Sequence, residues 1–185
     1  MSLVPYANID KLPEDVRKAL ADAPVQLNIF KMFANAETCF IPFTRLGGAI
    51  LGRQQLDAKL REMAILLAVG IEGGEYEWVQ HVPIAIAVGA NQAQVDAIAK
   101  RKLDASCFDE LERAILRFTE QVVEKVRADE AVVKEAMKFL SPREIVELIM
   151  TIGFYMTAAR ITETTRTDPD PPAGTKVIDA IRRQE

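Results

Sequence analysis

Three side chains that can transfer protons lie close together in the sequence, at Glu62, Glu77 and His81. His81 is the only histidine in the chain, and an imidazole with an unperturbed pKa of about 6.5 exchanges protons near neutral pH. Glu77 and His81 are four residues apart, so they share one face if this segment is helical. Two carboxylates around one imidazole form a proton-handling cluster if they are buried. The alternative is a pairing of Glu77 with His81 on a solvated surface.

Two helices joined by a glycine turn are expected to position these residues. Residues 56–71 form one apolar helical segment, and a second helix is expected over residues 75–88. Gly73 and Gly74 end the first helix, because glycine adopts the positive-φ conformation of a C-terminal cap without strain. This short turn predicts an antiparallel helical hairpin, which can place Glu62 opposite the second helix.

The remainder of the chain also shows helical spacing, and strand signals are nearly absent, so the predicted fold class is all-α. Before the hairpin, residues 36–50 form an apolar segment, in which Pro42 fits a helix break or a first-turn position. The last helix has a strong start signal at residues 141–144, Ser-Pro-Arg-Glu. Further helices are expected over residues 12–22, 26–35, 91–101, 106 or 109 to 126, 129–139 and 141–161.

The chain is expected to form a single helical domain over residues 1–161, followed by a polar, proline-rich segment over residues 162–185. The 185 residues are 49% hydrophobic and 27% charged, which suffices for one domain with a sizeable core. The C-terminal segment is not expected to form a regular helix. It is either a loose tail or an arm that lies on a neighbouring subunit.

The composition argues against several classes of partner. The net charge of −4 gives no general reason to expect nucleic-acid binding, and no uncharged apolar run reaches the ~18 residues of a membrane span, so no membrane partner is expected either. Cys39 and Cys107 form no Cys-x-x-Cys motif, which favours a reduced, cytoplasmic protein. With one histidine and no cysteine cluster, no metal site is assigned.

Aromatic and basic residues near the cluster are candidates for substrate binding. Tyr76 and Trp78 flank Glu77 and can wall a pocket, although Trp78 also suits the protein core. A small carboxylate substrate would favour an arginine, through bidentate pairing. Arg53, before the hairpin, and Arg160, late on the last helix, are preferred, and each has a surface or structural role as its alternative. The full set of candidate arginines is Arg45, Arg53, Arg61 and Arg160.

The segment Leu60-Arg61-Glu62, followed by Tyr76-Glu77-Trp78 and His81, resembles the carboxymuconolactone decarboxylase family, which includes alkylhydroperoxidase-D-like proteins. The resemblance is clearest over residues 56–99. It implies an alkylhydroperoxidase-D-like helical bundle that assembles as a homo-trimer or homo-hexamer. The activity it implies is a carboxy-lyase-like loss of carbon dioxide, without a cofactor, from a small carboxylated lactone or keto acid in aromatic-compound degradation. His81, Glu77 and Glu62 are then the hypothetical proton relay.

One branch of that family carries a Cys-x-x-Cys pair, and this chain departs from it. Gly74 and Glu77 occupy the places where the two cysteines would be, and peroxide reduction needs both an attacking and a resolving thiol. Two rival functions stay open. One is a thiol-dependent peroxidase or disulfide reductase, which this departure disfavours. The other is a non-catalytic helical binding or assembly protein, in which Glu62, Glu77 and His81 would be exposed and unconnected.

Overall fold

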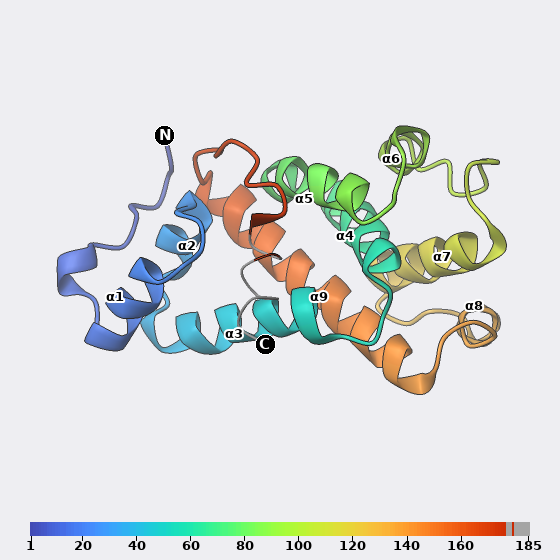
Figure 1. Ribbon diagram of the computed structural model, residues 1–185, viewed down its shortest axis with the longest axis horizontal. Coiled ribbons are helices and arrows are strands. Elements are labelled where there is room, and N and C mark those ends of the chain that lie inside the picture. Colours follow the sequence, from blue (N-terminus) through green and yellow to red (C-terminus); the bar gives the residue numbers. More distant parts are fainter. Residues whose placement is uncertain (177–178, 180–185) are drawn as a thin grey trace.

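The part of the chain that the computed structural model describes, residues 1–176 and residue 179, is helical and contains no strand (Figure 1). The all-α prediction is therefore confirmed. A single 3₁₀ turn, Ile9–Lys11, precedes the first α-helix. The α-helices are α1 Glu14–Ala21, α2 Asn28–Phe33, α3 Glu37–Arg53, α4 Ala58–Glu72, α5 Glu75–Ala87, α6 Gln92–Ala99, α7 Glu110–Lys125, α8 Glu130–Ala136 and α9 Pro142–Thr165.

Helix α4 is the central element of the fold, because it packs against α5, α6, α7 and α9. Every residue from Leu60 to Val69 is buried, as expected for a helix that is covered on all sides. Asp57 caps its N-terminus, since the carboxylate accepts hydrogen bonds from the amides of Lys59 and Leu60. Any polar side chain in the middle of α4 must therefore find its partners inside the protein.

The glycine turn between α4 and α5 forms the predicted hairpin. Gly73 ends α4 with φ = 73° and donates its amide to the carbonyl of Val69, which is a cap that favours glycine. Gly74 allows α9 to pass close by, because a Cβ there would lie 2.7 Å from the Cβ of Ala159. The turn thus fixes α5 against both α4 and α9.

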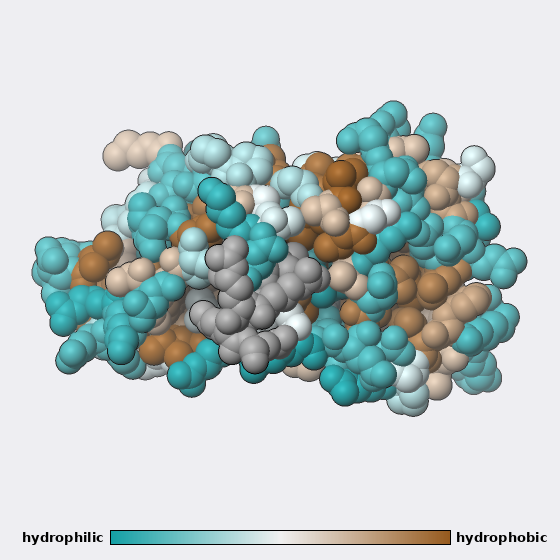
Figure 2. Space-filling model, viewed as in Figure 1, coloured by the Kyte–Doolittle hydropathy of each residue, from teal (hydrophilic) through white to brown (hydrophobic). Residues whose placement is uncertain are grey.

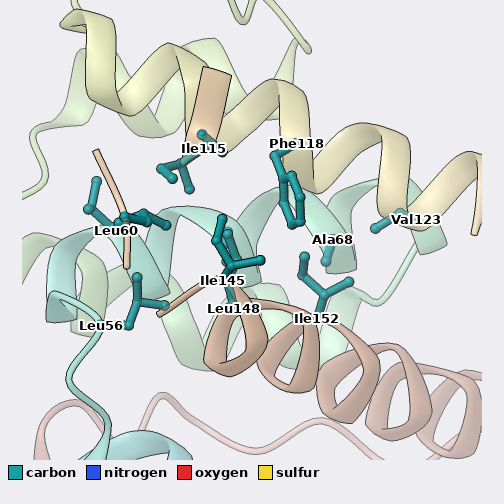
Figure 3. Close-up of a cluster of buried hydrophobic side chains, with 12 residues drawn as sticks. Leu56, Leu60, Ala68, Ile115, Phe118, Val123, Ile145, Leu148 and Ile152 are labelled. Atoms are coloured by element: carbon teal, nitrogen blue, oxygen red, sulfur yellow. The ribbon is translucent and has the colours of Figure 1, made fainter. Parts of the chain in front are cut away.

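Apolar side chains of α4, α7 and α9 form one core of the molecule (Figure 3). Ile115 and Phe118 of α7 meet Leu148 and Ile152 of α9 there. Helices α1 and α2 lie at the opposite end of the molecule from α6–α8, α3 extends from that end past the middle, and α9 runs between the two ends (Figure 1). The α4–α5 hairpin, which carries Glu62, Glu77 and His81, lies between these two ends.

Helix α9 is long and apolar enough to cross a membrane, judged by length and composition alone. Its Ile145, Leu148 and Ile152 pack in the core shared with α4 and α7, which accounts for that composition in a folded domain. Figure 2 shows further apolar side chains gathered over the α4–α5 region of the surface, and Val79 and Ile86 of α5 are exposed. Assembly as a homo-trimer or homo-hexamer stays a prediction.

The expected break or first-turn position at Pro42 is wrong, because this proline lies inside α3. The helix loses one backbone hydrogen bond there, and burial of Phe40 and Ile50 on the same helix offsets that loss. Helix α3 also passes through Gly47 and Gly48. Gly47 lies against the ring of Phe154, whose Cζ would be 2.8 Å from an added Cβ, so the absence of a side chain brings α3 close to α9.

The boundary expected at residue 162 is also wrong, because α9 continues to Thr165. Thr162 is buried and bonded to α5, and this contact favours the helical conformation that the local sequence does not predict. The following residues, 167–174, pack back onto the same chain through the contacts described below. They therefore contact their own chain, whereas contact of this segment with a neighbouring subunit stays a prediction. The remainder of the predicted tail, 177–178 and 180–185, lies outside the described residues.

Candidate active site

Glu62 of α4 and His81 of α5 form a buried acid–imidazole pair. The carboxylate atom Oε2 of Glu62 lies 2.7 Å from Nδ1 of His81, and the two residues are 0% and 7% exposed. Because the carboxylate engages Nδ1, the ring is held in one orientation and Nε2 is left as the nitrogen that can meet a bound molecule. Nε2 has no hydrogen-bond partner within the described part of the chain.

Arg61 supplies a positive charge beside this pair. Its Nε donates to Oε1 of Glu62 at 3.2 Å, and the arginine is itself buried. A carboxylate removed from water is stable only with such partners, because its desolvation is costly. Arg61, Glu62 and His81 therefore form a connected row of charged and titratable groups inside the protein.

Glu77 occupies a different environment, although it lies one helical turn before His81. It is 2% exposed, and the hydroxyl Oγ1 of Thr162 lies 3.0 Å from each of its carboxyl oxygens. Burial raises the pKa of Glu77 above its ordinary value, more than the Thr162 hydroxyl and the charge of His81 lower it. The same Thr162 hydroxyl lies within hydrogen-bond distance of the Ala158 and Ala159 carbonyls, so a neutral Glu77 can donate to Oγ1 while Thr162 donates to α9.

A cavity of about 310 Å³ lies beside these groups. Glu77 and His81 line it, whereas Glu62 stands behind the imidazole and does not. The other walls come from helices α1, α2, α3 and α9, from the α1–α2 connection and from the C-terminal segment. The cavity therefore extends from the acid–base groups of the hairpin to the N-terminal helices α1–α3.

The C-terminal segment closes one side of this cavity. Gln80 of α5 donates from Nε2 to the carbonyls of Asp170 and Pro171, and its Oε1 accepts the amide of Ala173. The Asp170 carboxylate accepts from the Tyr76 hydroxyl and from the amide of Asn28, each at 2.6 Å. We call residues 167–174 the strap, since they connect α9 to α2 and α5 across the cavity.

Of the four residues predicted to bind substrate, one lines the cavity and three do not. Tyr76 lines the cavity, and its hydroxyl is bonded to the strap; burial next to Asp170 raises its pKa. Trp78 instead lies against Gly70 and the core. Arg53 is exposed at the end of α3, and Arg160 is exposed and pairs with Glu72. The described structure therefore brings neither arginine nor Trp78 to the cavity, where a substrate arginine had been expected.

Thr162, Gln80 and Asp170 were not identified as site residues from the sequence. Their contacts join segments more than 80 residues apart, so no local pattern reports them. One signal was present on α3, where the cavity-lining residues share one helical face by their spacing. These residues are Phe40, Phe43, Thr44, Gly47, Gly48 and Leu51.

Thiol and metal chemistry find no support in the described residues. Cys39 is exposed and Cys107 is partly buried, and neither belongs to the cavity lining. No group of three or more histidine, cysteine, aspartate or glutamate side chains within the described part of the chain is arranged to hold a metal ion. Among the described residues, Glu77 and His81 supply acid–base groups to the cavity wall, with Glu62 behind the imidazole.

Residues 40–121, which include α4 and α5 and the three acid–base residues, match the model of the carboxymuconolactone decarboxylase family. Residues 40–121 belong to this family. The resemblance seen in the sequence is thereby confirmed, and a family-level function is supported. No curated protein matches the chain in sequence.

Solved structures with the alkylhydroperoxidase-D-like fold resemble the chain over most of its length. An uncharacterized peroxidase-related protein from Ralstonia eutropha JMP134, described as an alkylhydroperoxidase AhpD core, is 21% identical, with 91% of this chain and 92% of that chain covered and a TM-score of 0.79. A peroxidase-related protein from Silicibacter sp. TM1040 is 19% identical, with the same coverage and a TM-score of 0.77. A variant of the debrominase Bmp8, in complex with 2,3,4-tribromopyrrole, is 18% identical, covers 98% of each chain and has a TM-score of 0.73. These likenesses show the fold.

Proposed function

We propose that the chain is a cofactor-independent acid–base enzyme that decarboxylates a small carboxylated lactone or keto acid of aromatic-compound degradation, or catalyses a related proton transfer. The observation that carries this proposal is the 2.7 Å contact between Glu62 Oε2 and His81 Nδ1. It orients a buried imidazole at the wall of a cavity large enough for a small molecule. Membership of residues 40–121 in the decarboxylase family supports it.

In the proposed reaction, the bond between the substrate carbon and its carboxylate breaks, and carbon dioxide leaves. The bonding electrons move to the adjacent carbonyl and form an enolate. His81 then gives a proton from Nε2 to the carbon, while Glu62 balances the positive charge that the ring carries when both nitrogens are protonated. Burial raises the pKa of Glu77, and in its protonated form Glu77 can turn its single O–H from Thr162 to the developing oxyanion.

An apolar cavity favours the first step. A substrate carboxylate removed from water is less stabilised there than in solution, and its charge disperses as carbon dioxide departs. The walls beyond Glu77 and His81 are mostly aromatic and aliphatic side chains. The cavity therefore supports loss of a carboxylate more than it supports tight binding of one.

A screen of small carboxylated lactones and keto acids, in which carbon dioxide release is measured, tests the proposal. With an active substrate, His81→Gln should lower turnover by roughly 10²- to 10⁴-fold, the usual range for a positioned acid–base group. Cys39→Ser combined with Cys107→Ser is the control and should leave the rate nearly unchanged. Parental turnover by His81→Gln would refute the relay. Dithiol-dependent peroxide consumption that the cysteine changes abolish would favour the peroxidase alternative.

A further inference from the structure

The walls of the cavity beside His81 are mostly apolar away from its acid–base end, and aromatic rings are prominent among them. Five phenylalanines contribute to its walls: Phe30, Phe33, Phe40, Phe43 and Phe154. They come from α2, α3 and α9, so the N-terminal helices and the last helix build this part of the cavity together. A ligand that reaches His81 must therefore lie among aromatic side chains.

Three of these phenylalanines, together with Tyr155, form a continuous row of rings that leads to the imidazole. Phe43 stacks on Phe154 with centroids 4.2 Å apart and an interplanar angle of 18°, and Phe33 meets Phe43 edge-on at 5.1 Å. Phe154 contacts Tyr155 at 5.2 Å, and Tyr155 contacts the ring of His81 at 4.6 Å. Aromatic walls of this kind pack best against another flat ring, through stacked or edge-to-face contacts.

The charges around the cavity disfavour a ligand with several carboxylates. The carboxyl and imidazole side chains among the described lining residues are those of Asp22, Glu77 and His81, and no lysine or arginine is among them. Glu62 adds a further carboxylate behind His81. One ligand carboxylate can accept from His81 or from a neutral Glu77. A second one would lose its hydration beside acidic groups, with no cation to compensate.

The volume sets the size of the ligand. An apolar cavity of about 150 Å³ is sufficient to bind benzene, and this cavity of about 310 Å³ has roughly twice that volume. It therefore has space for one or two rings with small substituents, and lies at the lower end of the volumes found for ligand sites.

We infer that the cavity binds a flat compound of one or two rings that carries no more than one negative charge. This inference rests on the proposed function, because it names the substrate class of the same site. It also implies that Gly48 helps to set the size limit. Gly48 lies on the cavity-lining face of α3, and a Cβ added there would meet no atom within 4 Å.

Binding, measured without turnover, tests the inference by calorimetric titration with four probes. Benzamide and benzoate carry no charge and one charge. Isophthalamide and isophthalate have nearly the same shape but differ by two charges. We expect benzamide, benzoate and isophthalamide to bind, and isophthalate to bind at least about tenfold more weakly than isophthalamide, which corresponds to about 1.4 kcal/mol. Equal binding of isophthalate and isophthalamide, or no binding of benzamide and benzoate, would overturn the inference.

A pair of matched variants places the probes in the cavity. Gly48→Leu should weaken benzamide binding by at least about tenfold, since its side chain fills the space that the ligand needs. Gly153→Leu is the control, because Gly153 is also an unobstructed helical glycine but is exposed on α9 and outside the cavity lining. The smaller change Gly48→Ala should have an intermediate effect and guards against misfolding of Gly48→Leu. Unaltered binding by both Gly48 variants would contradict the assignment.

The two proposals can fail separately. Ring binding as described, with no carbon dioxide released from any lactone or keto acid, leaves the ligand class standing and removes the reaction. Carbon dioxide release that depends on His81, together with equal binding of isophthalate and isophthalamide, removes the ligand class and leaves the reaction.

Discussion

Glu62 and Glu77 are two buried glutamates on adjacent helices, and they differ in what surrounds them. Glu62 is bonded to a guanidinium and an imidazole, whereas Glu77 is bonded to a threonine hydroxyl. The Arg61 guanidinium offsets the cost of taking the first carboxylate out of water. The second has its pKa raised by burial. The same residue type therefore lies beside a guanidinium and an imidazole in one place, and in a buried environment that favours its protonated form in the other.

The largest effect that this comparison predicts is on stability when Glu62 is removed. Glu62→Ala leaves Arg61 buried without its partner, and loss of one member of a buried ion pair costs roughly 3–5 kcal/mol. Urea unfolding of the variant measures this loss. The control is Glu72→Ala, because Glu72 pairs with the exposed Arg160, and such pairs contribute about 0–1 kcal/mol. Similar losses in the two variants would show that Glu62 is not a charged group in the folded protein.

The second prediction concerns the pH dependence that Glu77 confers. An acid with a raised folded pKa binds more protons when folded, so its contribution to stability falls as pH rises from about 4.5 through the raised value and is constant above it. Glu77→Gln cannot lose a proton. We therefore expect its free energy of unfolding, relative to that of the parent protein, to increase over this pH range.

Denaturant unfolding at a series of pH values checks this expectation. Glu37→Gln, at an exposed position of α3, is the matched substitution and should show little change with pH relative to the parent. If the Glu77→Gln difference is independent of pH, or decreases as pH rises, then Glu77 is already ionised in the folded protein and the contrast with Glu62 disappears.

The hairpin that carries these glutamates could be predicted from local sequence, and the rest of the site could not. The Gly73–Gly74 turn and the four-residue spacing of Glu77 and His81 are short-range signals, and α4 and α5 follow them closely. The partner of Glu77 is set by the passage of α9 beside α5, which no local pattern reports. The choice of Arg53 and Arg160 assumed that a carboxylate substrate needs a cation, whereas the described lining of the cavity is mostly apolar and includes no arginine or lysine.

The packing of the C-terminal strap onto the domain could not be predicted for a related reason. Its proline-rich sequence has no regular hydrogen-bonding pattern of its own, so its path depends on the side chains that receive it. Those are Gln80 and Tyr76 of α5 and the amide of Asn28. A polar, irregular segment can therefore be well placed when the folded domain supplies its hydrogen bonds.

The smallest predicted effect tests whether the strap maintains the environment of Glu77. Asp170→Ala removes the acceptor of the Tyr76 hydroxyl and of the Asn28 amide, so both hydrogen bonds that hold the strap at this point are lost. If the strap then loosens, water reaches the cavity and the pKa of Glu77 falls toward its ordinary value. The upper limit of the pH range over which the contribution of Glu77 to stability falls should then move to lower pH. Glu62 does not line the cavity and should keep its contribution to stability. Asp168→Ala is the control, because Asp168 bonds Tyr6 and the N-terminus and is outside the cavity lining. An unshifted pH profile in Asp170→Ala would mean that α5 and α9 alone keep water away from Glu77. The same shift in both variants would mean that the effect is not specific to the contacts of Asp170 with Tyr76 and Asn28.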